Sequence, residues 1–131
     1  MNYNYMCSAK LFSYSDFVEN FDRGLLDGIY LVNAGTMSYS GLIRSVNDDS
    51  IIMDLPLKFY AGENVMYTPV IIGREEVIEI KEIPVDGHIK IMTKKDGEFA
   101  GDIECAYSNR IVINSDGERT IIYYQDFVNI E

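Results

Sequence analysis

The sequence contains no tryptophan, one histidine, two cysteines and three prolines among its 131 residues. A single histidine and the absence of CxxC or HExxH spacing exclude the common zinc motifs. Cys7 and Cys105 lie far apart in the sequence, and we expect free thiols in a reducing compartment. Scarce proline and a charged fraction of 24% argue against disorder.

Long hydrophobic runs are missing as well. No apolar stretch approaches the roughly 20 residues that a membrane-spanning helix needs. Residues 1–10 lack the basic start and the apolar core of a signal peptide. We therefore expect a cytoplasmic protein with no membrane contact.

Basic residues are in the minority. The chain has 11 Lys and Arg against 21 Asp and Glu, which gives a formal net charge of −10. A negative field repels phosphate backbones, so the charge disfavours RNA and other nucleic acids as partners. It also keeps a protein soluble, and a local basic patch remains compatible with it.

The residues that are plentiful are those of β-strands. Ten tyrosines accompany many isoleucines and valines. Before them, Asp16–Arg23 is predicted to be a short helix, capped by Ser15 or by Asp16 with Glu19 three residues later. Its apolar stripe consists of Phe17, Phe21 and Leu25. The N-terminal segment is rich in aromatic residues, namely Tyr3, Tyr5, Phe12 and Tyr14. It should dock either on the β-barrels predicted from the strands that follow or on a neighbouring subunit.

From Gly28 onward the apolar residues alternate with a period of two, and turn residues such as Asp-Gly interrupt them. Ten short strands with hairpin spacing indicate antiparallel barrels or sandwiches. The candidate strands are 28–34, 37–46, 50–55, 65–73, 76–83, 88–94, 98–107, 110–114, 119–124 and 126–130.

The strands repeat. Residues 29–54 align with 89–114, so that Ile29 meets Ile89 and Gly41 meets Gly101, and residues 70–80 align with 120–130. The extra residues of the first copy fall in Leu55–Tyr67, which we expect to be a loop. The alternative is that any two β-rich halves align this well, but the apolar positions agree in phase throughout. The expected division is residues 1–27 as N-terminal segment and helix, 28–84 as first unit and 85–131 as second unit.

The segment 41–53, with a strand glycine, a polar turn and an apolar strand, resembles the first signature of the Sm-like (LSm and Hfq-like) family, and 101–113 resembles a second instance. The resemblance implies a mainly β fold with a short N-terminal helix and tandem Sm-like or SH3-like five-stranded antiparallel barrels. Sm-like proteins close into rings through strand edges. The two units of one chain would then pair with each other, and three chains would close a six-unit ring.

The family's RNA-binding residues are not retained. Asp49 and Asn109 stand where an aromatic residue would stack on a base, and Arg74 is followed by two glutamates. Carboxylates along the path of RNA phosphates are unfavourable. The remaining candidates for a nucleic-acid site are Asp48, Asn109, Arg74, Lys94, Lys95 and Tyr124.

No catalytic constellation is visible. His88 is the only histidine and has no candidate nucleophile or acid in a known spacing. Glu75, Glu76 and Glu79 are interpreted as a solvated strand face, with a weak divalent-cation site as the alternative. We expect no enzyme, no cofactor and no metal. The favoured function is a non-catalytic binding or self-assembly protein that forms homo-oligomers or binds a protein partner; the alternative is an Sm-like RNA-binding ring.

Overall fold

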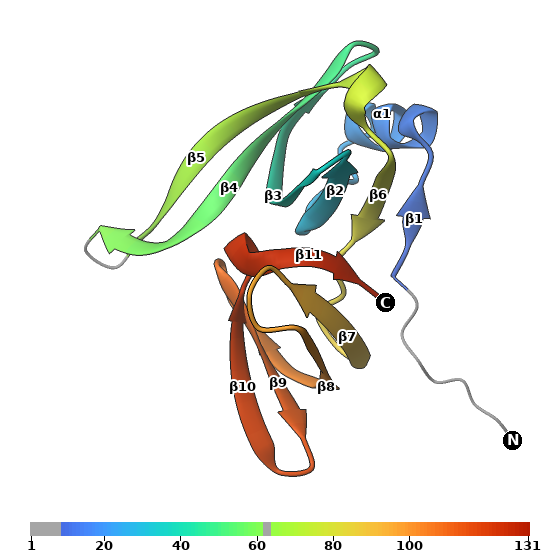
Figure 1. The fold of residues 1–131 in the computed structure, drawn as a ribbon. Coiled ribbons are helices and arrows are strands. Elements are labelled where there is room, and N and C mark those ends of the chain that lie inside the picture. Colours follow the sequence, from blue (N-terminus) through green and yellow to red (C-terminus); the bar gives the residue numbers. More distant parts are fainter. Residues whose placement is uncertain (1–8, 62–63) are drawn as a thin grey trace, which may run out of the picture.

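The computed structural model describes residues 9–61 and 64–131, and most of them lie in two antiparallel β-sheets (Figure 1). These residues contain one α-helix, α1 (Tyr14–Asp22), which follows the two-residue strand β1 and precedes the other strands of the first sheet. The prediction of a mainly β fold with a short N-terminal helix is therefore confirmed. Within the described ranges, no helix is both long and apolar enough to cross a membrane.

The first sheet has six strands, and one short 3-10 turn, η1 (Arg74–Glu76), lies between its last two strands in the sequence. Its spatial order is β1-β6-β2-β3-β4-β5. The strands are β1 (Leu11–Phe12), β2 (Tyr30–Ala34), β3 (Met37–Val46), β4 (Ser50–Ala61), β5 (Asn64–Gly73) and β6 (Glu79–Glu82).

The second sheet has five strands in the order β10-β9-β8-β7-β11, with η2 (Tyr124–Asp126) before its last strand. Neither sheet closes, because its two outermost strands do not pair with each other. Among the described strands, both units expected to be barrels are therefore open antiparallel sheets, and neither is a closed barrel. The strands are β7 (His88–Thr93), β8 (Glu98–Ala106), β9 (Arg110–Ser115), β10 (Glu118–Tyr123) and β11 (Phe127–Ile130).

Apart from β1, the two sheets have the same order of strands along the chain. The pairing of β3 with β4 shifts register around Arg44, and the pairing of β8 with β9 shifts around Glu104, at the equivalent place. Gly41 and Gly101 also correspond. A Cβ atom on either would overlap the carbonyl oxygen of the facing strand, at Asp54 or Asn114. Only glycine allows this close approach.

Two details of the expected alignment are wrong. Tyr30 faces Gly41, whereas Ile89 faces Gly101, so Ile89 corresponds to Tyr30 and not to Ile29. The turn between β7 and β8 contains the extra residue. The expected loop at Leu55–Tyr67 is instead the long β4–β5 hairpin, because strand pairing continues through Pro56. This hairpin extends away from the rest of the first sheet (Figure 1).

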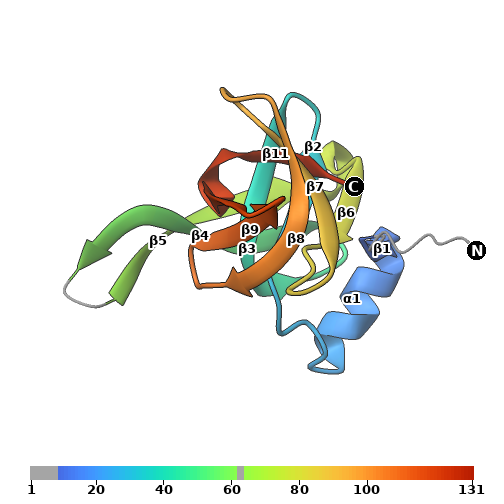
Figure 2. The ribbon, with the colours of Figure 1, turned by 90° about the horizontal axis from the view of Figure 1, so that it is seen from below.

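Helix α1 closes one end of the first core. Its cap is Ser13, not Ser15 or Asp16, since the Asp16 N–H donates to Ser13 Oγ at 3.1 Å. Phe17 is fully buried and its ring lies 5.4 Å, centre to centre, from the rings of Phe12 and Tyr30. The docking expected of the N-terminal aromatic residues thus occurs at Phe12 and Tyr14, which pack against this core, while Tyr3 and Tyr5 lie outside the described residues. Leu25 follows the helix and is exposed. Figures 1 and 2 place α1 and the far end of the β4–β5 hairpin on opposite sides of the molecule.

The two sheets pack through a shared interface. Tyr30 and Val32 point into the first core, but Leu31 between them belongs to the second core, together with Ile83. Strand β11 lies against β2 and β3. Among the described strands, none of one sheet pairs with a strand of the other. The expectation that the two units of a chain pair through their edges is therefore wrong, because apolar side chains hold one sheet against the face of the other.

Candidate functional site

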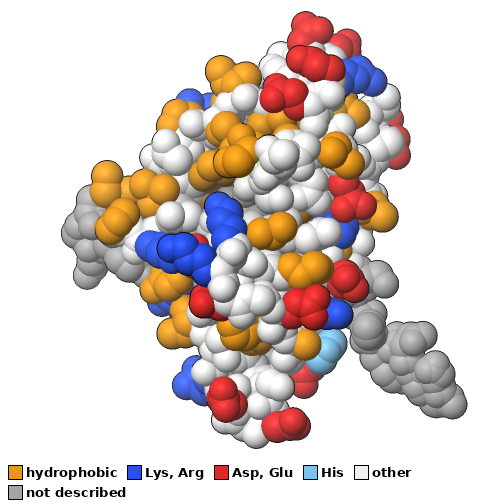
Figure 3. Space-filling model, viewed as in Figure 1, with side chains coloured by type: hydrophobic (Ala, Val, Ile, Leu, Met, Phe, Trp, Pro, Cys, Tyr) orange, Lys and Arg blue, Asp and Glu red, His pale blue; other side chains and the backbone are white. Residues whose placement is uncertain are grey.

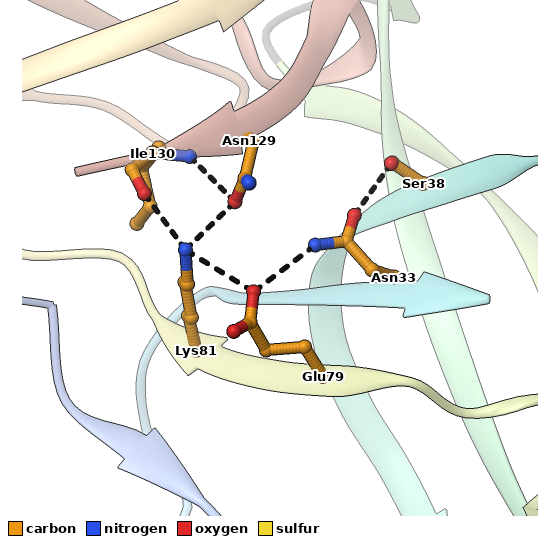
Figure 4. A network of polar contacts seen from close by, with 6 residues as sticks. All are labelled: Asn33, Ser38, Glu79, Lys81, Asn129 and Ile130. Carbon is orange, nitrogen blue, oxygen red and sulfur yellow. Dashed lines mark hydrogen bonds and ion pairs between the residues drawn. The ribbon is translucent and has the colours of Figure 1, made fainter. Parts of the chain in front are cut away.

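A chain of polar contacts holds one side of the interface between the sheets (Figure 4). Lys81 Nζ of β6 donates at 2.9 Å to Asn129 Oδ1 and to a backbone carbonyl of β11. It also forms an ion pair with Glu79 Oε1 at 3.2 Å. Asn33 Nδ2 donates to the same carboxylate at 3.5 Å, and Ser38 Oγ donates to Asn33 Oδ1 at 2.6 Å. Glu79 is thereby tied to the interface, so this part of the acidic run is not a simple solvated face.

A second set of contacts bridges β4 and the second sheet. Lys58 Nζ lies 2.7 Å from Asp126 Oδ2, and the Lys58 N–H donates to Gln125 Oε1 at 3.3 Å. Asn109 Nδ2 donates to the Leu57 carbonyl oxygen at 3.1 Å. These contacts hold η2 and the β8–β9 turn against β4.

A pocket of about 200 Å³ lies between the two sets of contacts. Strands β3, β4 and β5 form one wall, and η2 and the β7–β8 turn form the other. Neither sheet alone supplies both walls. Its apolar surface includes Tyr39, Leu55 and Pro56, and its polar groups include Ser40, Lys94 and Tyr124.

The polar groups of this pocket differ in their surroundings. Ser40 is 5% exposed, and its hydroxyl has no hydrogen-bond partner among the described groups. Ser40 faces Leu31 across β2 and β3, so both side chains point toward the second sheet. Burial raises the pKa of Tyr124 to about 12, so its hydroxyl remains a neutral donor at physiological pH. No ion pair within the described ranges involves Lys94.

The residues predicted to form a nucleic-acid site fall into separate places. Tyr124 and Lys94 line the pocket; Lys94 and its neighbour Lys95 are both exposed in the β7–β8 turn. Asn109 is 1% exposed and is used in the bridge to β4, which removes its side chain from contact with a ligand. The sequence did not single out Ser40 as a pocket residue.

Asp48 and Arg74 meet at the outer end of the first sheet. Arg74 Nη1 donates to the Asp48 carbonyl oxygen at 3.3 Å, and the guanidinium group lies 4.6 Å from the centre of the Tyr14 ring. Burial raises the pKa of Tyr14 above its usual value. Asp49 and Glu75 flank this shallow surface. Its acidic rim makes it a poor site for phosphate.

Comparison of the chain with family models, curated proteins and solved structures finds no match.

The strand edges differ in character. Among the described strands, β5 pairs only with β4, and none of its ten residues is charged. Met66, Tyr67 and Ile71 on this strand are 46%, 40% and 69% exposed. Figure 3 shows hydrophobic side chains gathered over this hairpin. By contrast, the edge strand β10 begins with charged residues, Glu118 and Arg119, as protected edges usually do.

The remaining reactive groups do not converge. His88 Nδ1 lies 3.1 Å from Asp102 Oδ1 in a solvent-exposed pair. Cys105 is a free thiol, and Cys7 lies outside the described residues. Glu76 accepts a hydrogen bond from the Gly73 N–H at 3.0 Å. In the described part of the chain, no group of three or more His, Cys, Asp or Glu residues is arranged to hold a metal ion.

Proposed function

We propose that the chain is a non-catalytic binding and self-assembly protein built from two Sm-like units that arose by internal duplication. The common strand order of the two sheets supports this proposal, as does the shift of register at equivalent residues, Arg44 and Glu104. The paired glycines, Gly41 and Gly101, add to it, since each allows the same close approach between strands. Unrelated β-rich halves have no reason to share these irregularities.

The unprotected edge of β5 is the observation that supports self-assembly. An unpaired strand presents a row of backbone donors and acceptors, and an uncharged, apolar edge is a template for another strand. Pro69 removes one donor from the row, which edge strands tolerate. The protruding hairpin keeps this edge clear of the second sheet (Figure 1).

The arrangement proposed is antiparallel pairing of β5 with β5 of a second copy about a twofold axis. The opposite margin of the first sheet is occupied, since Leu11 and Phe12 of β1 pair with Lys81 and Ile80 of β6. The ring contact implied by the Sm-like resemblance, fourth strand to fifth strand, would need that margin for the first unit. A twofold contact uses one self-complementary edge and closes after two chains.

Light scattering on the purified full chain, over a range of concentrations, tests this proposal. We expect the mass of two chains of 14.9 kDa each. Ile71→Lys places a charge on this apolar edge, as natural edge strands do to prevent pairing, so we expect association to weaken about tenfold or more. The fold tolerates this change because Ile71 is 69% exposed.

Ile121→Lys is the matched control. Ile121 occupies the equivalent position on β10, as the register of β9 with β10 matches that of β4 with β5, and it is 56% exposed. We expect its variant to associate like the original chain. A strict monomer at high concentration, or equal effects of the two variants, would refute the β5 contact. A mass of three chains would also contradict the twofold contact, which closes after two chains.

RNA binding is the second proposal, and the meeting of Lys94, Lys95 and Tyr124 at one place favours it. Contact with phosphates would make binding to short U-rich or A-rich RNA fall steeply with salt. A gel shift at low and at physiological salt measures this dependence. No shifted band at low salt would exclude the RNA-binding role.

A further inference from the structure

We propose that the pocket between the two sheets binds a small monocarboxylate with an apolar body, such as an aromatic or branched aliphatic acid. This site is separate from the β5 edge and does not depend on self-assembly. It combines an apolar wall with a buried hydroxyl, a neutral phenol and one cation.

The size and walls of the pocket decide the body of the ligand. Its volume of about 200 Å³ is smaller than the roughly 300–1,000 Å³ of sites for drug-sized molecules. Tyr39, Leu55 and Pro56 offer apolar surface, which favours a compact ring or branched chain. The pocket is bounded by bridging bonds on both sides, so it is formed before a ligand arrives.

Ser40 indicates a polar group on the ligand. A buried hydroxyl without a partner costs about 1–3 kcal/mol, and most buried polar groups in proteins are bonded. The Ser40 hydroxyl is such a group, and Ser40 is one of the residues that line the pocket. Rotation about the Cα–Cβ bond is the motion that would aim the hydroxyl at a ligand oxygen.

Lys94 decides the sign of the ligand's charge. It lines the pocket, and the one acidic side chain that η2 carries nearby, Asp126, is already paired with Lys58 at 2.7 Å. A cation beside an apolar wall attracts an anion, even in a chain with a net charge of −10. One ammonium group balances a single negative charge, which favours a carboxylate over a phosphate. Tyr124 is held neutral by burial, so it does not repel the anion.

The test is a titration of the ¹⁵N-labelled full chain with benzoate, followed by amide chemical shifts. We expect saturable shifts in residues 38–41, 55–57 and 124–125, with a Kd on the order of 1 mM for a ligand of this size. Benzamide has the same shape without the charge and should bind at least fivefold more weakly. The Ile71→Lys chain should give the same result, which separates this site from the β5 contact.

Lys94→Gln should weaken benzoate binding at least fivefold. Lys95→Gln is the matched control, since both lysines are exposed in the same turn but only Lys94 lines the pocket. It should change the Kd less than twofold.

Ser40→Ala separates binding from structure. Loss of an unpartnered hydroxyl should leave the urea midpoint unchanged or raise it, while benzoate binding falls about threefold or more. The proposal is overturned if the amide chemical shifts do not saturate at about 50 mM benzoate, a concentration well above the expected Kd. Equal binding of benzamide, equal effects at Lys94 and Lys95, or unchanged binding by Ser40→Ala would overturn it as well.

Discussion

Replacing Leu31 by alanine tests whether the two sheets fold as one unit. Leu31 belongs to β2 of the first sheet, yet it is fully buried in the core of the second. Large-to-small changes at such sites cost about 2–5 kcal/mol, since burial is lost and a cavity remains. We take about 3 kcal/mol for Leu31→Ala. For a chain of this length that amounts to roughly 10 °C in Tm.

Native-state hydrogen exchange reports the loss strand by strand. If the sheets unfold together, protection should fall by the same free energy in β3 and β4 as in β8 and β9. Leu25→Ala is the control, because Leu25 is 53% exposed; we expect a change below about 0.5 kcal/mol. A loss confined to one sheet, or a loss below about 1 kcal/mol, would refute the account of a common core.

Three further changes test the backbone, the pocket and the interface. Gly41→Ala should destabilise the chain by several kcal/mol or prevent folding, because its Cβ overlaps the Asp54 carbonyl; Gly28→Ala, where ordinary contacts suffice, should cost about 1 kcal/mol or less in urea unfolding. Burial raises the pKa of Tyr124 from 10.0 to about 12. The free energy of unfolding linked to the neutral form is present below pH 10 and is lost between pH 10 and 12, about 3 kcal/mol in all. Urea unfolding at pH 9 and at pH 11.5 should therefore show a smaller loss of stability for Tyr124→Phe than for the original chain. Lys81→Met removes the cation paired with the Glu79 carboxylate and the side-chain donor to the β11 carbonyl, so thermal unfolding should show a loss of about 1–3 kcal/mol; an unchanged Tm would contradict this role.

The alternation of apolar residues predicted most strands, and β3 has the same bounds as its predicted strand. Side-chain period indicates that a strand exists and which residues share a face. It does not show where a turn carries one residue more, so the alignment of Ile29 with Ile89 failed. It also does not show how far two strands stay paired. Pro56 suggested a loop, but it lies buried within the β4–β5 hairpin.

The pocket was only partly predictable. The sequence indicates Lys94 and Tyr124 as candidates for a nucleic-acid site and not for a small-molecule pocket. Ser40 was missed because its face of β3 would point to solvent in a single isolated unit. Only the packing of the second sheet against that face buries it. No local pattern reports a contact between residues so far apart in the chain.

The two-residue strand β1 has a consequence for growth by strand addition. Leu11 and Phe12 occupy the margin of β6 that a further copy would need in order to continue the first sheet. A molecule with one free edge and one blocked edge cannot form a continuous intermolecular sheet by strand addition. Removing β1 would leave the first sheet with two unpaired edges, and we expect such a variant to form fibrils.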